Sequence, residues 1–485
     1  MLFKKFKRVF SRTLYKDQMI LTGKMDFAKD FIHDTRGDLY PIITASPDCQ
    51  EMIRENMWQI ISGETERMFC RFIPYLTCEM RAETGENAFA GFGYHFNGTA
   101  IRIMITAADI LFHAEGEEEQ RIPLPSGTDT VKQWLVTCRP GAFDVYLRKN
   151  GKAEFLGTFH SESAGNIQAY EVYSDGFVTA LGGNGVTIHQ VSAGVDNGVS
   201  TADIRAIRYE DGTPMVENGR IFFTVSLRME EQQYQGIYAW VPGTADFTLT
   251  GVLFYDAGDG IRANDVAASI LYHRTEKQWL LWVCSFSHGH IPGHSAFTGD
   301  PRYGVNVIDI TLMPPMSADD PTTAFLGKAG DEDPDFVYDP VTGKWHMAIC
   351  RIAPETTSYR YYFYESDSPF TGYHYIGRGE PGAETGGSFV TINGERCFIC
   401  GNDFEKRSDY RIYRKDGMET PVFDFPDGGF RGWGTILPVK QGSRCHYYWL
   451  TFDRHKGSNY NWSYGNLYCF EGELDPHGQG MWDRT

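Results

Sequence analysis

The chain contains no long hydrophobic run. No stretch of eighteen apolar residues occurs among its 485 residues, so no segment is predicted to cross a membrane as a helix. The first twenty residues are basic, and they lack the continuous apolar region and small-residue cleavage site of a secretory signal. These absences predict a cytoplasmic protein without a membrane partner.

An excess of positive charge is also missing. The chain carries 63 acidic and 45 basic residues, for a formal net charge of −18. A surface of this sign repels the phosphates of nucleic acids and anionic lipids. The composition therefore argues against a nucleic-acid partner, while oligomeric state is left open.

Helical heptads are not evident, and the ten cysteines are scattered. Cys397 and Cys400 form a CxxC pair, but in a strand-like run where they face opposite sides, with no second pair at zinc-ribbon spacing. We therefore predict no metal site and no cofactor. Aromatic residues make up 14% of the chain and glycine occurs 52 times, a mixture that favours an all-β protein with many turns.

A strand-and-turn unit recurs through the second half of the sequence, with an acidic residue ahead of the first strand in four of five copies. The copies read EDGTPMVENGRIFFTVS from Glu210, NDVAASILYHRTEKQWLLWV from Asn264, DPDFVYDPVTGKWHMAI from Asp333, ETGGSFVTINGERCFIC from Glu384 and FRGWGTILPVKQGSRCHYYWLTF from Phe430. Spacings of roughly fifty to seventy residues suit propeller blades. The sequence predicts a five-bladed β-propeller over residues 204–475, whose first strands gather these carboxylates around one axial pocket.

Two segments precede the predicted propeller. Residues 1–50 combine a basic start with a possible short helix, whereas residues 51–195 alternate apolar and polar residues between Asn-Gly turns. The second segment resembles the concanavalin-like jelly-roll sandwiches that accompany carbohydrate-active enzymes. This resemblance implies either a scaffold that packs on the propeller or a sugar-recognition module.

The carboxylates of the predicted blades resemble those of glycoside hydrolase families 43 and 32, and family 43 most closely. The run Asp333–Asp339, DPDFVYD, fits the family's blade-three motif, Asp211 precedes the Phe222-Phe223 pair, and Glu384 starts blade four. The resemblance covers about 270 residues. It departs from the family pattern at Asp211-Gly212, where the family has Asp-Pro, and after Glu384, where it has Glu-x-Pro-His.

The resemblance implies a role for each of three carboxylates. Asp211 would be the base, Glu384 the acid, and Asp333 the neighbour whose charge raises the pKa of the acid. An inverting enzyme holds acid and base about 6.5–9.5 Å apart, whereas in a retaining one Asp211 would be the nucleophile at about 5–5.5 Å. Asp203, which also precedes blade one, is the reserve candidate for the base.

Further residues near the predicted pocket are candidates for binding substrate. His288 and His290 belong to the run HGHIPGH, which could bind sugar hydroxyls, form an exposed loop or, with His294, bind a metal; we expect substrate contact. An arginine and a tryptophan at a pocket rim suit sugar recognition, although core packing is an alternative for the tryptophan. The substrate-binding candidates are Asp265, Arg262, His288, His290, Arg431 and Trp433.

These observations predict a glycoside hydrolase, exo-acting or directed at oligosaccharides, with a carbohydrate as its partner. A furanoside substrate is implied by the family resemblance alone. Residues 210–224 also resemble the first blade of family 130 mannoside phosphorylases, in which one Asp is the acid and phosphate attacks. The alternatives are therefore a phosphate-dependent enzyme with Asp211 as its acid, or a non-catalytic carbohydrate-binding protein.

Overall fold

The computed structural model describes residues 2–34, 39–312, 331–352, 358–402, 409–421, 432–442, 444–452 and 466–474. The chain divides into two compact units. One comprises Met1–Leu14, Asn197–Asp259 and Ala263–Thr485, and the other comprises Tyr15–Asp196 and Gly260–Arg262. Among the described residues, helices are too short and too polar for any of them to cross a membrane.

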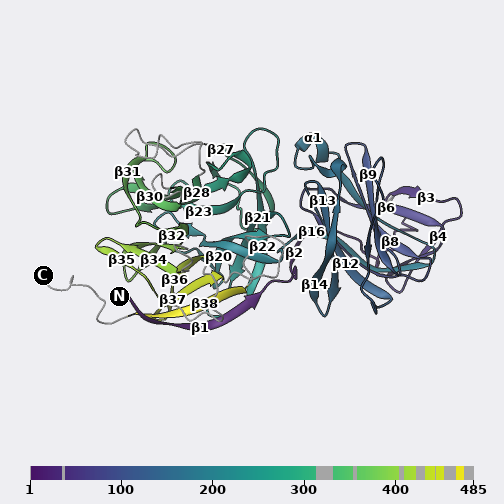
Figure 1. Cartoon of the computed structure of the whole chain (residues 1–485), viewed down its shortest axis with the longest axis horizontal. Coiled ribbons are helices and arrows are strands. Elements are labelled where there is room, and N and C mark those ends of the chain that lie inside the picture. The colour runs from purple at the N-terminus through teal and green to yellow at the C-terminus, as the bar shows by residue number, and fades with distance from the viewer. Residues whose placement is uncertain are drawn as a thin grey trace. The chain divides into compact units, whose positions relative to one another are not determined.

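The larger unit is a five-bladed β-propeller, as predicted (Figure 1). From the innermost strand outward, blade one contains β17 (Ser200–Ala206), β20 (Arg220–Arg228), β21 (Gln233–Trp240) and β22 (Phe247–Asp256), with β19 (Val216–Glu217) beside β20 and β26 (Gly304–Asp309) beside β22. Blade two contains β23 (Val266–His273), β24 (Gln278–Ser285), β25 (Ile291–Phe297) and β27 (Thr311–Leu312), with β18 (Arg208–Tyr209) beside β23, and blade three contains β28 (Asp331–Asp339), β29 (Lys344–Ile352), β30 (Tyr359–Ser366) and β31 (His374–Arg378). Blade four contains β32 (Glu384–Ile392), β33 (Glu395–Asn402), β34 (Asp409–Arg414) and β35 (Gly417–Glu419), and blade five contains β36 (Gly432–Gln441), β37 (Arg444–Phe452), β38 (Asn466–Leu474) and β1 (Phe3–Thr13). A short 3₁₀ helix, η2 (Phe286–His288), follows β24.

The middle strands of the blades are apolar on both faces because each blade packs between two neighbours. In β20, RIFFTVSLR, every residue after Arg220 is buried, and β24 and β33 are buried almost throughout. Such strands read as continuous apolar runs instead of alternating patterns. The second, aromatic-rich run of each repeated unit could therefore be recognised in the sequence as a strand.

Blade five is closed by the N-terminal strand. The short helix suggested for the start of the chain is wrong, because β1 pairs antiparallel with β38 from Phe3↔Leu474 to Thr13↔Asn466. Phe3 and Phe6 pack against Tyr447 and Trp449, with ring centroids 5.6 and 5.3 Å apart. Phe3, Phe6 and Phe10 are spaced three and four residues apart, which is the spacing of one face of a helix. Two bulges in β1 allow a strand with this spacing to pack its phenylalanines on the blade.

The smaller unit contains two antiparallel sheets around one core. Its first sheet orders β11 (Gln120–Pro123), β10 (Asp109–Ala114), β9 (Thr99–Ile105), β8 (Phe89–Phe96), β15 (Phe177–Gly183), β6 (Glu64–Arg71) and β3 (Ile42–Ala45); the second orders β14 (Lys152–His160), β13 (Ala142–Lys149), β12 (Val131–Arg139), β7 (Thr77–Glu83), β16 (Val186–Asp196), β5 (Met57–Ser62) and β4 (Gln50–Arg54), with β2 (Met19–Lys24) beside β16. Two short helices, η1 (Glu162–Ala164) and α1 (Tyr170–Tyr173), connect strands. Phe92 and Trp134 join the sheets with ring centroids 5.2 Å apart. The concanavalin-like jelly-roll connectivity stays a prediction.

Candidate active site

Each innermost strand of the propeller has a β-bulge at the same register position. The pairing shifts between Ala202 and Arg205 in blade one and at the corresponding points of the other four blades. The bulged residue has a positive φ in the first four blades: Asp203 (52°), Ala267 (61°), Asp333 (49°) and Gly386 (61°). A bulge re-aims a side chain out of the regular pleat. The first and third of these positions carry a carboxylate.

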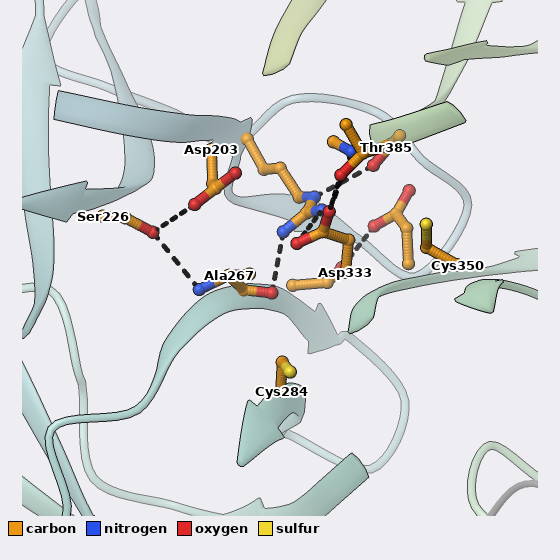
Figure 2. Close-up of polar contacts among 12 residues, drawn as sticks. Asp203, Ser226, Ala267, Cys284, Asp333, Cys350 and Thr385 are labelled. Atoms are coloured by element: carbon orange, nitrogen blue, oxygen red, sulfur yellow. Dashed lines mark hydrogen bonds and ion pairs between the residues drawn. The ribbon is translucent and has the colours of Figure 1, made fainter. Parts of the chain in front are cut away.

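Asp203 and Asp333 therefore come from different blades to one region at the starts of the inner strands. Figure 2 shows Asp203 with Ser226 beside it on one side of the region, and Asp333 with Thr385 beside it on the other. The Ser226 hydroxyl donates to Asp203 Oδ2 at 2.6 Å. The Thr385 hydroxyl and the Gly386 N–H donate to Asp333 Oδ2 at 2.7 and 2.8 Å.

The environment of Asp203 makes it a candidate proton donor. The pKa of this carboxyl is raised to about 6. Burial is the largest cause, and the negative charge of Asp333 acts in the same direction. The guanidiniums of Arg228 and Arg205 oppose both effects. Asp203 is only 5% exposed. A carboxyl that titrates near neutrality beside a second carboxylate is an arrangement that acid–base catalysis requires.

Arg205 crosses the axis and fixes this region. It is 1% exposed, and its Nε and Nη1 donate to the backbone carbonyls of Gly387 at 3.0 Å and Ala267 at 2.7 Å. Its Nη2 lies 3.9 Å from Asp333 Oδ1 and has no hydrogen-bond partner among the described residues. The guanidinium thus stabilises negative charge on Asp333 and leaves one buried donor unused.

A second polar layer lies two or three residues beyond the bulged residues of blades two to four and includes Arg208 of β18. Arg208 Nη2 donates to Asp335 Oδ1 at 2.5 Å, and the Ser269 hydroxyl donates to the same oxygen at 2.5 Å. The Phe389 N–H donates to Asp335 Oδ2 at 2.6 Å. These residues come from the sheets of blades two, three and four, so their contacts join three blades behind Asp203 and Asp333.

Buried thiols lie near the two carboxylates. Cys284 Sγ donates to the Asp331 carbonyl at 3.3 Å, and Cys350 Sγ donates to the Glu384 carbonyl at 2.9 Å, which links each blade to the next. Burial raises the pKa of both thiols well above its usual range. They are therefore neutral packing groups, as the apolar surroundings of most cysteines in the sequence predicted.

The structure places Asp211 away from Asp333, at the opposite end of the inner strands. Its carboxylate is 27% exposed, binds Arg274 Nη2 at 2.5 Å and accepts the Thr213 N–H at 2.9 Å. Burial opposes the effect of these two donors, yet the pKa of Asp211 is lowered. Our prediction started the propeller at residue 204, whereas the innermost strand of blade one, β17, begins at Ser200 and contains Asp203.

Glu384 is held in the protein interior. Its carboxylate is fully buried; Arg411 Nη1 and the Tyr413 hydroxyl donate to Oε1, the arginine at 2.6 Å, and the Tyr361 N–H donates to Oε2 at 3.0 Å. Glu384 stands two residues before the bulge position, in the register of Asp331, whose carboxylate binds Arg351 Nε at 2.5 Å. Sequence spacing alone did not distinguish this register from that of Asp333.

Asp265 and the two histidines predicted to bind substrate lie at the start of blade two. Asp265 is 1% exposed and accepts the Ser285 hydroxyl at 2.7 Å; burial raises its pKa. His288 contacts Ser285 Oγ at 2.8 Å and Asp259 at 2.9 Å. His290 contacts Glu332 Oε1 at 3.0 Å, and this hydrogen bond raises the pKa of the imidazole.

These histidines do not form a metal centre. His294 packs on Phe370, with ring centroids 4.5 Å apart, and no group of three potential metal ligands occurs in the described part of the chain. Of the remaining candidates, Arg262 belongs to the smaller unit and stacks over Tyr173 at 4.8 Å, and Arg431 is outside the described residues. Trp433 follows Gly432 in the bulge of β36, the register position that Asp203 and Asp333 occupy in their own blades.

Sequence reasoning missed four residues of this region: Arg205, Arg228, Glu332 and Tyr359. Glu332 adjoins Asp333 and accepts the Tyr359 hydroxyl at 2.5 Å, while Arg228 Nη2 lies 3.9 Å from Asp203 Oδ2. An alignment of Asp203-x-Arg205 with Asp333-x-Asp335 would have revealed the shared register. The other contacts of this region join residues of different blades, and they could be predicted only if the positions of the bulges were known.

The raised pKa of Asp203 has a consequence for stability. Between about pH 4 and pH 6 the folded chain retains a proton that the unfolded chain has released, so the free energy of unfolding falls as pH rises through this window. Asn cannot ionise and tolerates a positive φ. We expect Asp203→Asn to increase the free energy of unfolding by about 3 kcal/mol at pH 8 and by much less near pH 4, measured by urea denaturation; a pH-independent difference would contradict this electrostatic account.

No protein-family model matches the chain, and no curated protein matches it. Solved structures with a similar fold include a family 62 glycoside hydrolase in complex with xylotriose (12% identity, 57% of this chain and 92% of that chain, TM-score 0.39). They also include a family 43 β-1,3-galactosidase with galactodeoxynojirimycin (12%, 56% and 95%, TM-score 0.39) and the α-L-arabinofuranosidase of Podospora anserina in complex with cellotriose (11%, 56% and 91%, TM-score 0.39).

Proposed function

We propose that this chain is a glycoside hydrolase in which Asp203 is the general acid and Asp333 is the ionised partner. The observation that carries the proposal is the pair itself. The two carboxyls occupy the same bulge position in two blades, one has a pKa of about 6, and the other is surrounded by donors and a guanidinium. Asp203, the reserve candidate for the base, thereby takes the role of acid that the resemblance gave to Glu384, and Asp333 takes the role of base or nucleophile that it gave to Asp211.

The two side chains divide the reaction between them. Asp203 gives its proton to the glycosidic oxygen as the bond from that oxygen to the anomeric carbon breaks, which releases the leaving group as an alcohol. In an inverting reaction Asp333 accepts a proton from the water that attacks the anomeric carbon; in a retaining one Asp333 attacks that carbon itself, and water later releases the sugar. Glu384 supports blade four in this scheme and touches no substrate.

The activity should depend on pH in the way an acid with this pKa requires. A general acid works in its protonated form, and the fraction of Asp203 that is protonated falls about tenfold per pH unit above its pKa. We expect kcat/KM to decline above about pH 6 and the declining limb to disappear in Asp203→Asn. A profile that stays flat from pH 6 to pH 8 would assign the proton to another group.

One observation favours a second candidate, phosphorolysis. The Arg228 guanidinium lies 3.9 Å from Asp203, and Arg205 Nη2 has no hydrogen-bond partner among the described residues. Two guanidiniums beside a single acid suit a phosphate nucleophile. In that reaction Asp203 would again protonate the leaving oxygen, and phosphate would replace water.

Sugar release from a panel of substrates tests the proposed function. The panel contains aryl furanosides, which the family 43 resemblance suggests, together with aryl pyranosides and short oligosaccharides, each with and without phosphate. Release without phosphate that is lost in Asp333→Asn supports hydrolysis. Release only with phosphate assigns the phosphorylase reaction, and sugar binding without any release assigns a recognition protein.

A further inference from the structure

The propeller has a cavity at the ends of the inner strands opposite Asp203 and Asp333. It measures about 380 Å³ and is lined by residues of blades one and two. In β23 the axial position Ala267 and the cavity residue Tyr272 are five residues apart, which corresponds to about 17 Å along a strand. The cavity is therefore separate from Asp203 and Asp333.

Aromatic side chains form one part of the cavity wall. Tyr209, Tyr272 and Trp279 line it, and the rings of Tyr272 and Trp279 meet edge to face with centroids 5.0 Å apart. Val216, which is 57% exposed, continues the apolar wall to the surface. Aromatic and apolar faces of this kind suit the C–H face of a sugar ring, which is apolar while its edge is polar.

A fixed ion network forms the polar part of the wall. Arg302 is 8% exposed; its Nη1 lies 2.9 Å from Glu217 and its Nη2 lies 2.7 Å from Asp300. Its guanidinium also stacks over Phe222 at 4.6 Å, and the Tyr303 hydroxyl donates to Glu217 at 3.0 Å. The carboxylates are thus held in place and retain lone pairs that can accept hydroxyl protons.

The charges of the cavity cancel. Its charged lining consists of two acidic residues, Glu217 and Asp300, and two basic residues, Lys277 and Arg302. Thr298 and the tyrosines add neutral polar groups. A neutral polar wall favours neither an anion nor a cation, although the chain as a whole carries a charge of −18. A neutral ligand with an apolar face and several hydroxyls matches all three properties of the wall.

We propose that this cavity is a second binding site, for a neutral saccharide, on the propeller side opposite the two carboxylates. The sugar ring packs against Tyr272 beside the exposed Val216, and its hydroxyls bind Glu217, Asp300 and Lys277. A site of this kind keeps a saccharide chain on the protein independently of catalysis. Its existence does not depend on whether Asp203 and Asp333 cleave a bond.

Binding of neutral trisaccharides to the full chain tests the proposal. Cello-, xylo-, manno- and arabinotriose are titrated by calorimetry into Asp333→Asn, which prevents turnover. Against this background, Tyr272→Ala removes the aromatic face, the near-isosteric Glu217→Gln removes one charged acceptor, and Val341→Ser changes a residue that is 91% exposed in blade three. We expect a binding event that weakens at least about tenfold in the first two variants and is unchanged in the third.

Three results would overturn the proposal. The first is the absence of binding by every trisaccharide, and the second is equal affinity in Tyr272→Ala and Glu217→Gln when both unfold with the same midpoint as their parent. The third is binding of inorganic phosphate or glucuronate in place of the neutral sugars. If Tyr272→Ala fails to fold, Glu217→Gln decides alone, because it preserves the shape of the side chain. None of these results depends on sugar release, which separately tests the proposed hydrolysis.

Discussion

Asp203→Asn is expected to lower kcat/KM on glycosides with a poor leaving group by about 10²–10⁴-fold, the usual contribution of a positioned general acid. Burial and the negative charge of Asp333 raise the pKa of the Asp203 carboxyl to about 6, so it holds its proton in weakly acidic solution. Asn keeps the shape and can still accept the Ser226 hydroxyl, but it has no proton to give to the leaving oxygen. The measurement is initial-rate kinetics on whichever substrate of the panel is cleaved.

Asp211→Asn is the matched control, since it makes the same chemical change at the other end of the inner strands. Asp211 is paired with Arg274 near the surface, so its removal should leave kcat/KM within about twofold, the range of a surface substitution. A large loss in Asp211→Asn with little loss in Asp203→Asn would restore the assignment that the sequence alone suggested.

Arg411→Met is expected to lower the free energy of unfolding by about 3–5 kcal/mol, because it leaves the carboxylate of Glu384 buried without its cation. Glu384 is fully buried and Arg411 is 8% exposed, and their side chains meet at 2.6 Å. Urea denaturation of the two proteins measures the difference. A loss below about 1 kcal/mol, the size of a surface ion pair, would show that the pair does not support the fold.

The double variant Glu384→Gln with Arg411→Met separates support from catalysis. Gln keeps an oxygen for the Tyr361 N–H and removes the unpaired charge, so more than half of the lost stability should return. Because Glu384 supports the fold of blade four and does not touch substrate in this scheme, the double variant should retain kcat/KM within about tenfold. A loss of several hundredfold in a stable double variant would make Glu384 the acid, as the family resemblance implied.

The propeller could be predicted from the sequence because its middle strands have an unusual pattern. Strands buried on both faces, such as β20 and β24, read as apolar runs between turns, and five such runs were visible. The innermost strand of blade one was not, because β17 contains Ser200, Thr201, Asp203 and Arg205 and resembles a linker. Its polar residues are buried only because other blades supply their partners.

The carboxylates illustrate the same limit at the level of single residues. Asp333 could be found from its motif, whereas Glu384 and Asp265 precede similar strands by two residues more and lie in another register. A bulge shifts a strand by one residue and changes which side chain is displaced toward the axis. Its positive φ is occupied by Asp in two blades, by Ala in one and by Gly in another, so the local sequence does not mark it.

The most direct test of the central claim compares two leaving groups in two variants. A dinitrophenyl glycoside needs no proton from the enzyme, whereas an alkyl glycoside does. If Asp203 is the acid and Asp333 the base or nucleophile, Asp203→Asn will cleave the dinitrophenyl substrate at close to the wild-type rate and fail on the alkyl one, and Asp333→Asn will fail on both. Equal losses on both substrates in Asp203→Asn would contradict the assignment of the acid, and full activity in Asp333→Asn would contradict the carboxylate pair itself.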